Sequence, residues 1–482
     1  MARVEAFFDF NDVVLVAALA LSLAIAGRVL AERLSVPTAA LLLVAFATLS
    51  DLFPGLRDAL SIGDVQRITT VALVVILFDG GMHIGPRRFQ RAAVPIAVLG
   101  VVGTFATAAL VAVAAHSLLD VSWTVAWLLG AALAPTDPAV TFSVLTGKEI
   151  RGRSGTILEG ESGFNDPVGI ALMIGMVELA TSDHGSVWTV VTEFAVEMSI
   201  GLAVGLAGGL ALLAVMRRVE LPEAALYPIR VLGLAVLVYG LAAFAHGSGF
   251  LAVFVAGIVI GDAAAPHKGE IERFHGALAS LAEMAAFVAL GITIDLTFIA
   301  EEGLWWQGIV LAVLLTFVIR PLVVGPLLLP VRLSWGERGF ITWSGLKGAV
   351  PILLASLAVV GGTDDADRIY GLTFVVVLFS VVVQGTAVPT VAARLGVPMR
   401  RSGLQRAEAV RLVVGEDTYA DGAAVRDLPL GERAWVSEIV RDGLRRRVSA
   451  ETMLEAGDAV VLFCAPEDER ALRRIFEGSQ SA

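Results

Sequence analysis

The sequence has little cysteine and little charge. Its single cysteine, Cys464, excludes an intrachain disulfide framework, and no Cys/His cluster has the spacing of a zinc site. Charged residues make up 17% of the 482 residues and apolar residues 57%, whereas soluble domains average about 25% and roughly 45–50%. This balance indicates a membrane protein. The net charge of −11 is summed over both sides of a membrane, and no nucleic-acid surface is predicted.

Apolar residues gather in blocks of about twenty, the length at which a helix crosses roughly 30 Å of hydrocarbon. The sequence therefore predicts an all-α polytopic membrane protein with about 13 transmembrane helices. No cleavage pattern closes the first block, so it is interpreted as the first helix and not as a signal peptide. The predicted segments are 10–30, 36–50, 66–84, 93–115, 122–145, 157–181, 188–216, 224–243, 249–263, 275–293, 304–329, 337–360 and 369–393.

Positive residues are distributed unevenly between the predicted loops. An odd number of segments puts the two termini on opposite sides of the membrane. With the N-terminus outside, about eighteen Lys and Arg residues fall in the inner loops and four in the outer ones. This bias predicts a cytoplasmic C-terminus.

The last part of the sequence changes character. Three short strand-like runs follow Arg400, at 409–414, 435–440 and 459–464. A final helix is predicted to begin at Pro466, with acidic residues in its first turn. We therefore expect a membrane domain over residues 1–400 and a cytosolic α+β lobe over residues 401–482. The lobe has no Gly-x-Gly-x-x-Gly or Walker loop, and no cofactor is predicted.

Two predicted helices are interrupted in mid-membrane. Residues 133–138 (Leu-Ala-Pro-Thr-Asp-Pro) hold two prolines and an acid, and residues 345–351 (Gly-Leu-Lys-Gly-Ala-Val-Pro) hold two glycines, a lysine and a proline. Because proline removes an amide donor and clashes with the preceding turn, each site should unwind and free backbone carbonyls for an ion. The breaks lie seven helices apart, as expected for inverted repeats whose broken helices cross. Two proline kinks without function are the alternative.

Two of the acids in the next predicted helix, Glu161 and Asp166, need different partners. Ser162 and Asp166 share one helix face, while Glu161 lies on another. An ionised carboxylate in hydrocarbon needs a cation, a proton or a ring of dipoles. Arg320 is the fixed cation deep in a predicted span, and we expect it to pair with Glu161. Asp166 is then left either to neighbouring donors or, as we prefer, to an ion that it takes up and releases.

Other polar residues in the predicted spans have less definite assignments. Asp79 is either a water-mediated ligand or a helix cap near the inner surface. Lys347, beside the second break, is expected to neutralise helix-end dipoles and not to touch the substrate. Glu283 has no predicted partner, and no histidine is assigned a ligand role.

These motifs together resemble one known family. The Thr-Asp-Pro break at 136–138, the run Glu-Ser-Gly-Phe-Asn-Asp-Pro at 161–167, Arg320 and the 345–351 motif are similar to the NhaP-type cation/proton antiporters. The resemblance spans most of residues 10–395. Its Phe-Asp-Gly-Gly-Met stretch is most similar to the potassium/proton branch called cell volume regulation protein A. Residues 405–478 resemble the TrkA-C lobe of regulators of potassium conductance.

The resemblance implies a cation site and a setting for it. The implied cation-binding residues are Thr136, Asp137, Ser162, Asp166 and, acting through water as the outer acid, Asp79. Asn165 would position the site without binding the ion. Lys347 stands where the family usually has arginine, so a bidentate fork is lost there. A homodimer in the bacterial inner membrane and a small regulatory ligand on the lobe are also implied.

The predicted function is exchange of one monovalent cation, K⁺ or Na⁺, for one proton by competition for Asp166. An amide at Asn165 has no proton to contribute, and Glu161 is held by Arg320, so one carboxylate remains to titrate. We also consider a cation channel gated by the tail, whose flux would not be coupled to protons. A third class is an intramembrane serine hydrolase with Ser162 as nucleophile and His246 as base, which would explain neither Arg320 nor the paired breaks.

Overall fold

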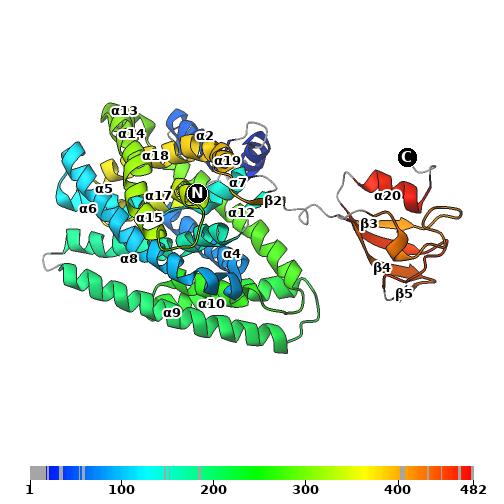
Figure 1. Cartoon of the computed structure of the whole chain (residues 1–482). Helices are drawn as coiled ribbons and strands as arrows, with labels where there is room; N and C mark the ends of the chain where they lie inside the picture. Colours follow the sequence, from blue (N-terminus) through cyan, green and yellow to red (C-terminus); the bar gives the residue numbers. More distant parts are fainter. Residues whose placement is uncertain are drawn as a thin grey trace, which may run out of the picture. The chain divides into compact units, whose positions relative to one another are not determined.

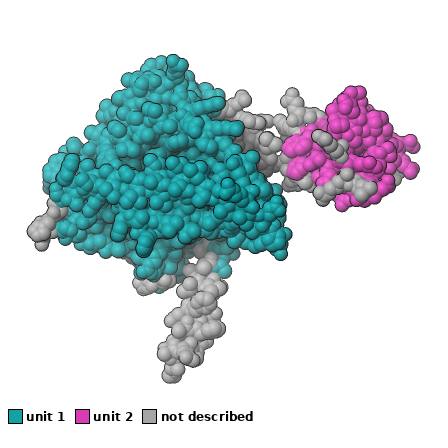
Figure 2. Space-filling model, turned by 90° about the horizontal axis from the view of Figure 1, so that it is seen from below, with its two compact units in different colours: residues 1–146, 150–398 teal, residues 147–149, 399–482 magenta. Residues whose placement is uncertain are grey.

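The computed structural model (Figure 1) describes residues 18, 21–31, 36–53, 55–56, 60–145, 148–150, 152–182, 186–401, 408–430, 434–446, 448–464 and 468–478. Most of the predicted segment 10–30 before Leu21 lies outside these ranges, as does Pro466. The chain forms two compact units (Figure 2). One comprises residues 1–146 and 150–398, and the other comprises residues 147–149 and 399–482.

The larger unit is helical, as predicted. Its α-helices are α2 (Thr38–Leu52), α4 (Ile62–Ala97), α5 (Thr104–Leu119), α6 (Trp123–Leu133), α7 (Pro138–Val144), α8 (Arg153–Thr181), α9 (Val187–Arg218), α10 (Leu226–Phe244), α11 (Gly249–Gly261), α12 (Lys268–Ile292), α13 (Leu296–Glu301), α14 (Leu304–Leu314), α15 (Arg320–Leu328), α16 (Trp335–Trp343), α17 (Ala349–Val360), α18 (Ala366–Phe379) and α19 (Thr386–Arg394). Three π-helical turns join some of these helices end to end: η1 (Val98–Gly103), η2 (Leu315–Ile319) and η3 (Ser380–Gly385).

Within the described ranges, seven helical stretches are long and apolar enough to cross a membrane, and five shorter apolar helices accompany them. The multi-pass architecture is therefore confirmed, while the count of thirteen spans and the inverted-repeat symmetry stay predictions. The longest stretch, Ile62–Leu119, has 58 residues, too many for one crossing of roughly 30 Å. It bends at Gly85, whose φ of 64° belongs to the left-handed region that glycine tolerates.

The α4 bend is fixed from outside the helix. The Asp262 carboxylate, just after α11, accepts a hydrogen bond from the Arg87 amide at 2.9 Å, and Pro86 precedes that amide. The second half of α4 thus begins with a capping acid and a proline, both favoured at a helix start. A Cβ at Gly85 would lie 2.7 Å from the Asp262 Cγ, so glycine also makes room for the cap.

Glycines let α4 and α11 pack with their backbones in contact. A Cβ at Gly81 would lie 2.3 Å from the carbonyl oxygen of Phe254 on α11. A Cβ at Gly257 would lie 2.4 Å from the carbonyl oxygen of Phe78 on α4, so the close approach is reciprocal. Asp79, the residue after Phe78, therefore lies in a firmly packed part of α4.

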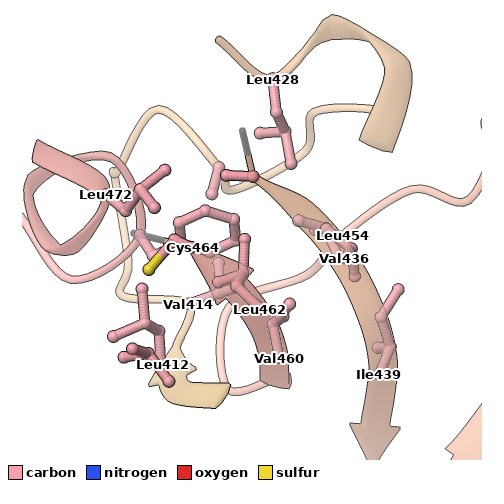
Figure 3. Packing of buried hydrophobic residues seen from close by; sticks show 14 residues of the cluster. Leu412, Val414, Leu428, Val436, Ile439, Leu454, Val460, Leu462, Cys464 and Leu472 are labelled. Carbon is pink, nitrogen blue, oxygen red and sulfur yellow. The ribbon is translucent and has the colours of Figure 1, made fainter. Parts of the chain in front are cut away.

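The smaller unit contains an antiparallel sheet of four strands in the order β3–β6–β4–β5, followed by one helix. These elements are β3 (Glu408–Val413), β4 (Trp435–Arg441), β5 (Leu444–Arg446), β6 (Ala459–Cys464) and α20 (Glu469–Phe476). Two further strands, β1 (Lys148–Ile150) and β2 (Met399–Arg401), form a separate pair. Alternating residues of the sheet, such as Leu412 and Leu462, pack with Leu472 of α20 in a closed apolar core (Figure 3). The three predicted strands are confirmed, and so is the last helix, although it begins at Glu469 and not at the predicted Pro466, which lies outside the described residues.

One buried carboxylate in this lobe has a fixed counter-ion. The Arg441 guanidinium donates from Nε to the Asp458 Oδ1 at 2.7 Å and from Nη2 to Oδ2 at 2.8 Å. Asp458 is 1% exposed and also accepts from the Glu455 amide at 2.9 Å. The hydrogen bonds from Arg441 lower the pKa of the Asp458 carboxyl below its usual value.

We expect Asp458→Asn to lower the unfolding temperature of the lobe at pH 7 by about 5 °C, the shift that roughly 1 kcal/mol produces in a small domain. Because the folded pKa of Asp458 is depressed, its contribution is complete above the unfolded pKa of about 4 and disappears as the pH falls through the folded pKa. The difference between the variant and the wild type should therefore vanish in acid.

This difference is measured by thermal unfolding of the full chain at a series of pH values. Proteolysis of the lobe is the readout of unfolding. The control is Asp427→Asn, whose carboxylate is 63% exposed beside Arg426, where ion pairs contribute little. An Asp458→Asn effect that stayed constant down to pH 2 would contradict the linkage.

Candidate cation site

The first break separates α6 from α7. α6 ends at Leu133, α7 begins at Pro138, and the intervening residues have no regular structure. The carbonyl of Ala134 would pair with the amide of residue 138 in a continuous helix, but proline has none. Pro138 instead takes the first position of α7, where a free amide is not needed. The prolines therefore produce the predicted interruption.

The second break separates α16, which ends at Trp343, from α17, which begins at Ala349. Its two glycines allow close packing of charged side chains. A Cβ at Gly345 would lie 2.2 Å from the Arg320 Nε, and a Cβ at Gly348 would lie 1.9 Å from the Asp137 Oδ2. Neither position has room for a side chain unless a charged group moves.

The two breaks are in direct contact. The amide of Asp137 donates to the carbonyl of Leu346 at 2.8 Å, so the crossing of the two interrupted helices is confirmed. Lys347 Nζ donates to the carbonyls of Ala134 and Pro135 at 2.9 and 2.8 Å. An ammonium at the C-terminal end of α6 is favourable because the helix dipole is negative there. Lys347 thus occupies the position that a dipole-neutralising role requires.

Asp166 lies on α8, facing the breaks. It is 4% exposed, and within the described part of the chain its Oδ1 has no hydrogen-bond partner. Ser162, one turn earlier on the same helix face, is also buried. The charged groups that act on Asp166 are Asp137 of the first break and Lys347 of the second. A carboxylate with a free oxygen is therefore set where both breaks meet.

Asn165 ties α8 to the first break. Its Nδ2 donates to the Thr136 Oγ1 at 2.8 Å, and both residues are buried. Because the amide side chain is engaged with Thr136, it fixes the distance between the Asp166 turn and the threonine carbonyl. Asn165 carries no charge into the site.

Glu161 and Arg320 form the expected ion pair. Arg320 Nη1 donates to the Glu161 Oε1 at 2.6 Å and Nη2 donates to Oε2 at 3.1 Å, with side-chain exposures of 6% and 3%. The bidentate geometry fixes both groups and neutralises Glu161. Arg320 follows the π-turn η2 at the start of α15. Glu161 therefore has a fixed partner, unlike the Asp166 Oδ1 on the same helix.

Comparison with known proteins agrees with this arrangement. Residues 18–394 match the transmembrane domain of the sodium/hydrogen exchangers. The chain belongs to this family. Residues 409–477 match the TrkA-C domain. The family consists of secondary transporters, so the chain is a transporter and not an enzyme.

Relatives of this exchanger cover most of its length. It is 29% identical to the K⁺/H⁺ antiporter NhaP of Alkalimonas amylolytica over 86% of this chain and 74% of that protein. It is also 29% identical to the Na⁺/H⁺ antiporter NhaH of Halobacillus aidingensis, over 80% of this chain and 99% of that one. The sodium proton antiporter MjNhaP1 of Methanocaldococcus jannaschii has the same fold, with a TM-score of 0.69 at 23% identity, covering 80% of this chain and 99% of that one.

Asp79 of the exchanger lies in a different polar group. It sits inside α4, with its Oδ2 3.3 Å from the His83 Nδ1. Its Oδ1 is buried and has no hydrogen-bond partner in the part of the chain that the structure describes. The groups that act with it are His275 and Lys268 of α12. The structure therefore brings Thr136, Asp137, Asn165 and Asp166 together through the breaks and directs Asp79 toward α12.

Two residues that sequence reasoning missed hold the second break. The Ser380 Oγ accepts from the Lys347 amide at 2.9 Å and donates to the Gln384 Oε1 at 3.0 Å. Gln384 in turn donates from Nε2 to the Trp343 carbonyl and accepts at its own carbonyl from the Trp343 Nε1. The polar pair four residues apart in the apolar segment 369–393 was the available signal.

We expect Gly348→Ala to reduce exchange by on the order of tenfold or more, since a displacement near 1 Å at a reacting group commonly has such an effect. The added methyl would overlap the Asp137 carboxylate and push it away from Asp166. Initial rates in everted vesicles, normalised to inserted protein, measure the loss. The control is Gly233→Ala in α10, where a Cβ would meet nothing within 4 Å. Wild-type rates in Gly348→Ala would contradict the proposed packing of the site.

Proposed function

We propose that this chain exchanges one monovalent cation, K⁺ or Na⁺, for one proton across the bacterial inner membrane, and that both ions compete for Asp166. The observation that carries the proposal is the buried Asp166 carboxyl, whose Oδ1 lacks a partner among the described residues at the meeting point of the two breaks. Relatives named as K⁺/H⁺ and Na⁺/H⁺ antiporters support the class of reaction.

The proposed cation ligands are oxygens from α8 and the first break. Carboxylate, hydroxyl and carbonyl oxygens suit a hard monovalent cation. The binding residues are Thr136 through its carbonyl, Asp137, Ser162 and Asp166. Asp79 remains in the proposal as the outer acid that acts through water. Asn165, Lys347 and the pair Glu161 and Arg320 are assigned to positioning, because the Asn165 Nδ2, the Lys347 Nζ and the Glu161 carboxylate bond protein atoms. The Asn165 Oδ1 has no hydrogen-bond partner among the described residues, but it carries no charge and no proton to exchange.

Obligatory exchange follows from the charge on Asp166. A bare carboxylate is too unfavourable in a low-dielectric site to be carried between the two access states. A bound cation or a bound proton neutralises it, so only an occupied site changes its side of access. Alternating access would move one helix bundle against the other about the crossed breaks.

The two competing functions have less support. A serine hydrolase would require Ser162 beside His246, but Ser162 is buried within α8 whereas His246 is exposed in the turn that follows α10. A tail-gated channel would not need a titrating carboxylate with a free oxygen at its centre. Membership of an exchanger family favours neither.

The setting of the exchanger is proposed from its sequence and relatives. A domain boundary near residue 400 follows from the change to strand-like runs after Arg400. An N-terminus outside and a C-terminus in the cytoplasm follow from the loop charges. The TrkA-C lobe would bind a small regulatory ligand, and the exchanger would act as a homodimer embedded in lipid. Apolar side chains such as Trp188 and Leu202 on α9 are exposed and suit contact with lipid.

Kinetics in proteoliposomes test the proposal. We expect the apparent KM for the cation to rise as the pH falls, by up to about tenfold per pH unit, because protonation of Asp166 excludes the cation. We also expect the rate to be insensitive to membrane potential, since moving a net charge across 100 mV would add about 2.3 kcal/mol. Potentials are set with valinomycin and fixed potassium gradients, and sodium is the test ion if it is carried.

Three outcomes are distinguishable. A KM that does not change with pH would overturn competition at one group. A clear voltage dependence would indicate a second titrating group, with Asp79 or Asp137 the first to test. Cation flux without proton movement would favour the channel.

A further inference from the structure

Ionisable residues outside the cation site line one face of α12. Lys268, His275 and Glu283 are separated by seven and eight residues, which places them along one side of a helix with 3.6 residues per turn. Hydrocarbon-spanning helices rarely carry such residues without a functional reason. α4 packs against α12 and contributes Asp79 and His83, which lie one helical turn apart.

Asp79 lies directly against the α12 backbone. A Cβ at Gly276 would come within 4.0 Å of the Asp79 Oδ1, so the carboxylate is beside the residue that follows His275. The ring of His275 also packs on Phe78, the neighbour of Asp79, with ring centroids 5.4 Å apart. The carboxylate and the imidazole are thus brought together from facing helices.

His275 is buried with one ring nitrogen unused. The residue is 0% exposed, and its Nδ1 lies 2.8 Å from the carbonyl of Ile271. A carbonyl only accepts, so Nδ1 carries the proton and Nε2 presents a lone pair. In the described structure Nε2 has no hydrogen-bond partner, and the same holds for the Asp79 Oδ1, whereas the Lys268 Nζ lies 3.4 Å from the Glu272 Oε1. Buried polar atoms without a protein partner call for an explanation, such as a bound group, water or a transfer role.

The exposure of these residues decreases along the helices. The His83 side chain is 55% exposed, that of Lys268 16% and that of Asp79 13%, while His275 is fully buried. The next residue on the α12 face, Glu283, is partly buried and acts electrostatically with Asp137 of the first break and with Arg28. The series therefore leads from one surface of the membrane unit to the cation site.

Charged groups of the described residues surround His275. Asp79 and Lys268 act on it directly; Asp262 and Glu272 act on Lys268, and Glu159 acts on His83. The other helices packed on α12 add little charge near His275. Arg230 of α10 stacks on Tyr227, and Asp51 of α2 accepts from the Thr297 amide. α17 has no charged residue. The face is mixed in sign, with an ammonium beside the imidazole.

We propose that this series, hereafter the α12 track (His83, Asp79, His275, Glu283), conducts protons between the membrane surface near Lys268 and the cation site, with His275 as the transfer residue. The proposal rests on the proposed exchange function. Nε2 of neutral His275 binds a proton from the Asp79 side and forms an imidazolium. It returns to the neutral ring when that proton passes along water toward the Glu283 carboxylate, which lies eight residues, or about 12 Å, farther along the helix.

The experiment replaces His275 by glutamine, which keeps a polar side chain but carries no titratable proton. We expect the saturating exchange rate to fall at least about tenfold, in the range that proton transfer contributes to catalysis, while the apparent cation KM stays unchanged. Added imidazole should restore part of the rate to His275→Ala. A purely structural role for His275 would show neither the unchanged KM nor this rescue.

His116→Gln is the matched control, because this half-buried histidine also bonds a backbone carbonyl through Nδ1, that of Val121 at 2.7 Å, but lies in α5 away from the track. It should leave the rate and its pH profile unchanged. If His275→Gln does not insert, Glu283→Gln on the same face takes its place, with the same expected split between rate and KM.

Wild-type rate and pH profile in an inserted His275→Gln or Glu283→Gln variant would overturn the α12 track. The proposed function has a separate readout in the same vesicles. Coupled exchange that persists in Asp166→Asn would overturn the exchange mechanism, whereas loss of coupling in Asp166→Asn together with wild-type kinetics in His275→Gln would overturn the track alone.

Discussion

Replacing Asp166 by asparagine is expected to abolish cation/proton exchange, at least a hundredfold below the wild-type rate, while the protein remains folded and inserted. The amide cannot release a proton and has no negative charge to hold a dehydrated cation, so both half-reactions lose their ligand. The fold should tolerate the change because the Asp166 Oδ1 bonds no described residue. Rates in proteoliposomes and the unfolding temperature in detergent measure the two effects.

The matched control for this variant is Glu178→Gln. Glu178 lies on the same helix, α8, three turns beyond Asp166, and is exposed. Exchange at the wild-type rate is expected there. Substantial coupled activity in Asp166→Asn would remove Asp166 from the centre of the mechanism.

Removing either partner of the Glu161 and Arg320 pair is expected to act on stability first. Both side chains are almost fully buried and bonded to each other through two hydrogen bonds. Glu161→Gln or Arg320→Gln strands a buried charge, which destabilises by roughly 3–5 kcal/mol when a pair is fully buried. Expression, monodispersity and unfolding temperature should all fall, and the reciprocal swap Glu161→Arg with Arg320→Glu should recover part of the loss.

An exposed pair provides the comparison. Asp64 and Arg67 at the start of α4 lie 3.2 Å apart with exposures of 49% and 83%, and Asp64→Asn should leave stability unchanged within error. Stable single variants at Glu161 and Arg320, together with a swap that recovers nothing, would show that the pair does not hold the site together.

The contrast between Glu161 and Asp166 on α8 could be predicted from the sequence because it depends on local features. Proline lacks an amide wherever it occurs, so the break at Pro135 and Pro138 follows from the residue type. Arg320 is a guanidinium deep in an apolar segment, and a buried charge must find its opposite. Once Arg320 is paired with Glu161, Asp166 remains as the acid without a fixed counter-ion.

The contacts across the site could not be predicted in the same way. Lys347 bonds the carbonyls of Ala134 and Pro135, 213 and 212 residues away, and helical spacing carries no information over such distances. Gly348 against Asp137 is a contact of the same kind. The His275 environment was missed for a different reason: hydropathy placed the start of the helix at residue 275, whereas α12 begins at Lys268. A hydropathy window selects apolar residues, so it misses the charged first turns of a helix.

The glycine contact between α4 and α11 has a mechanical meaning. Backbones that touch directly, as at Gly81 and Gly257, have no side chains between them that could change rotamer and let one helix slip along the other. α4 and α11 should therefore move as one rigid body during the transport cycle. Asp79 and His83 move with α4 and α11, whereas His275 belongs to α12. A movement of α12 relative to this helix pair during the change in access would therefore alter the distance between the Asp79 carboxylate and the His275 imidazole.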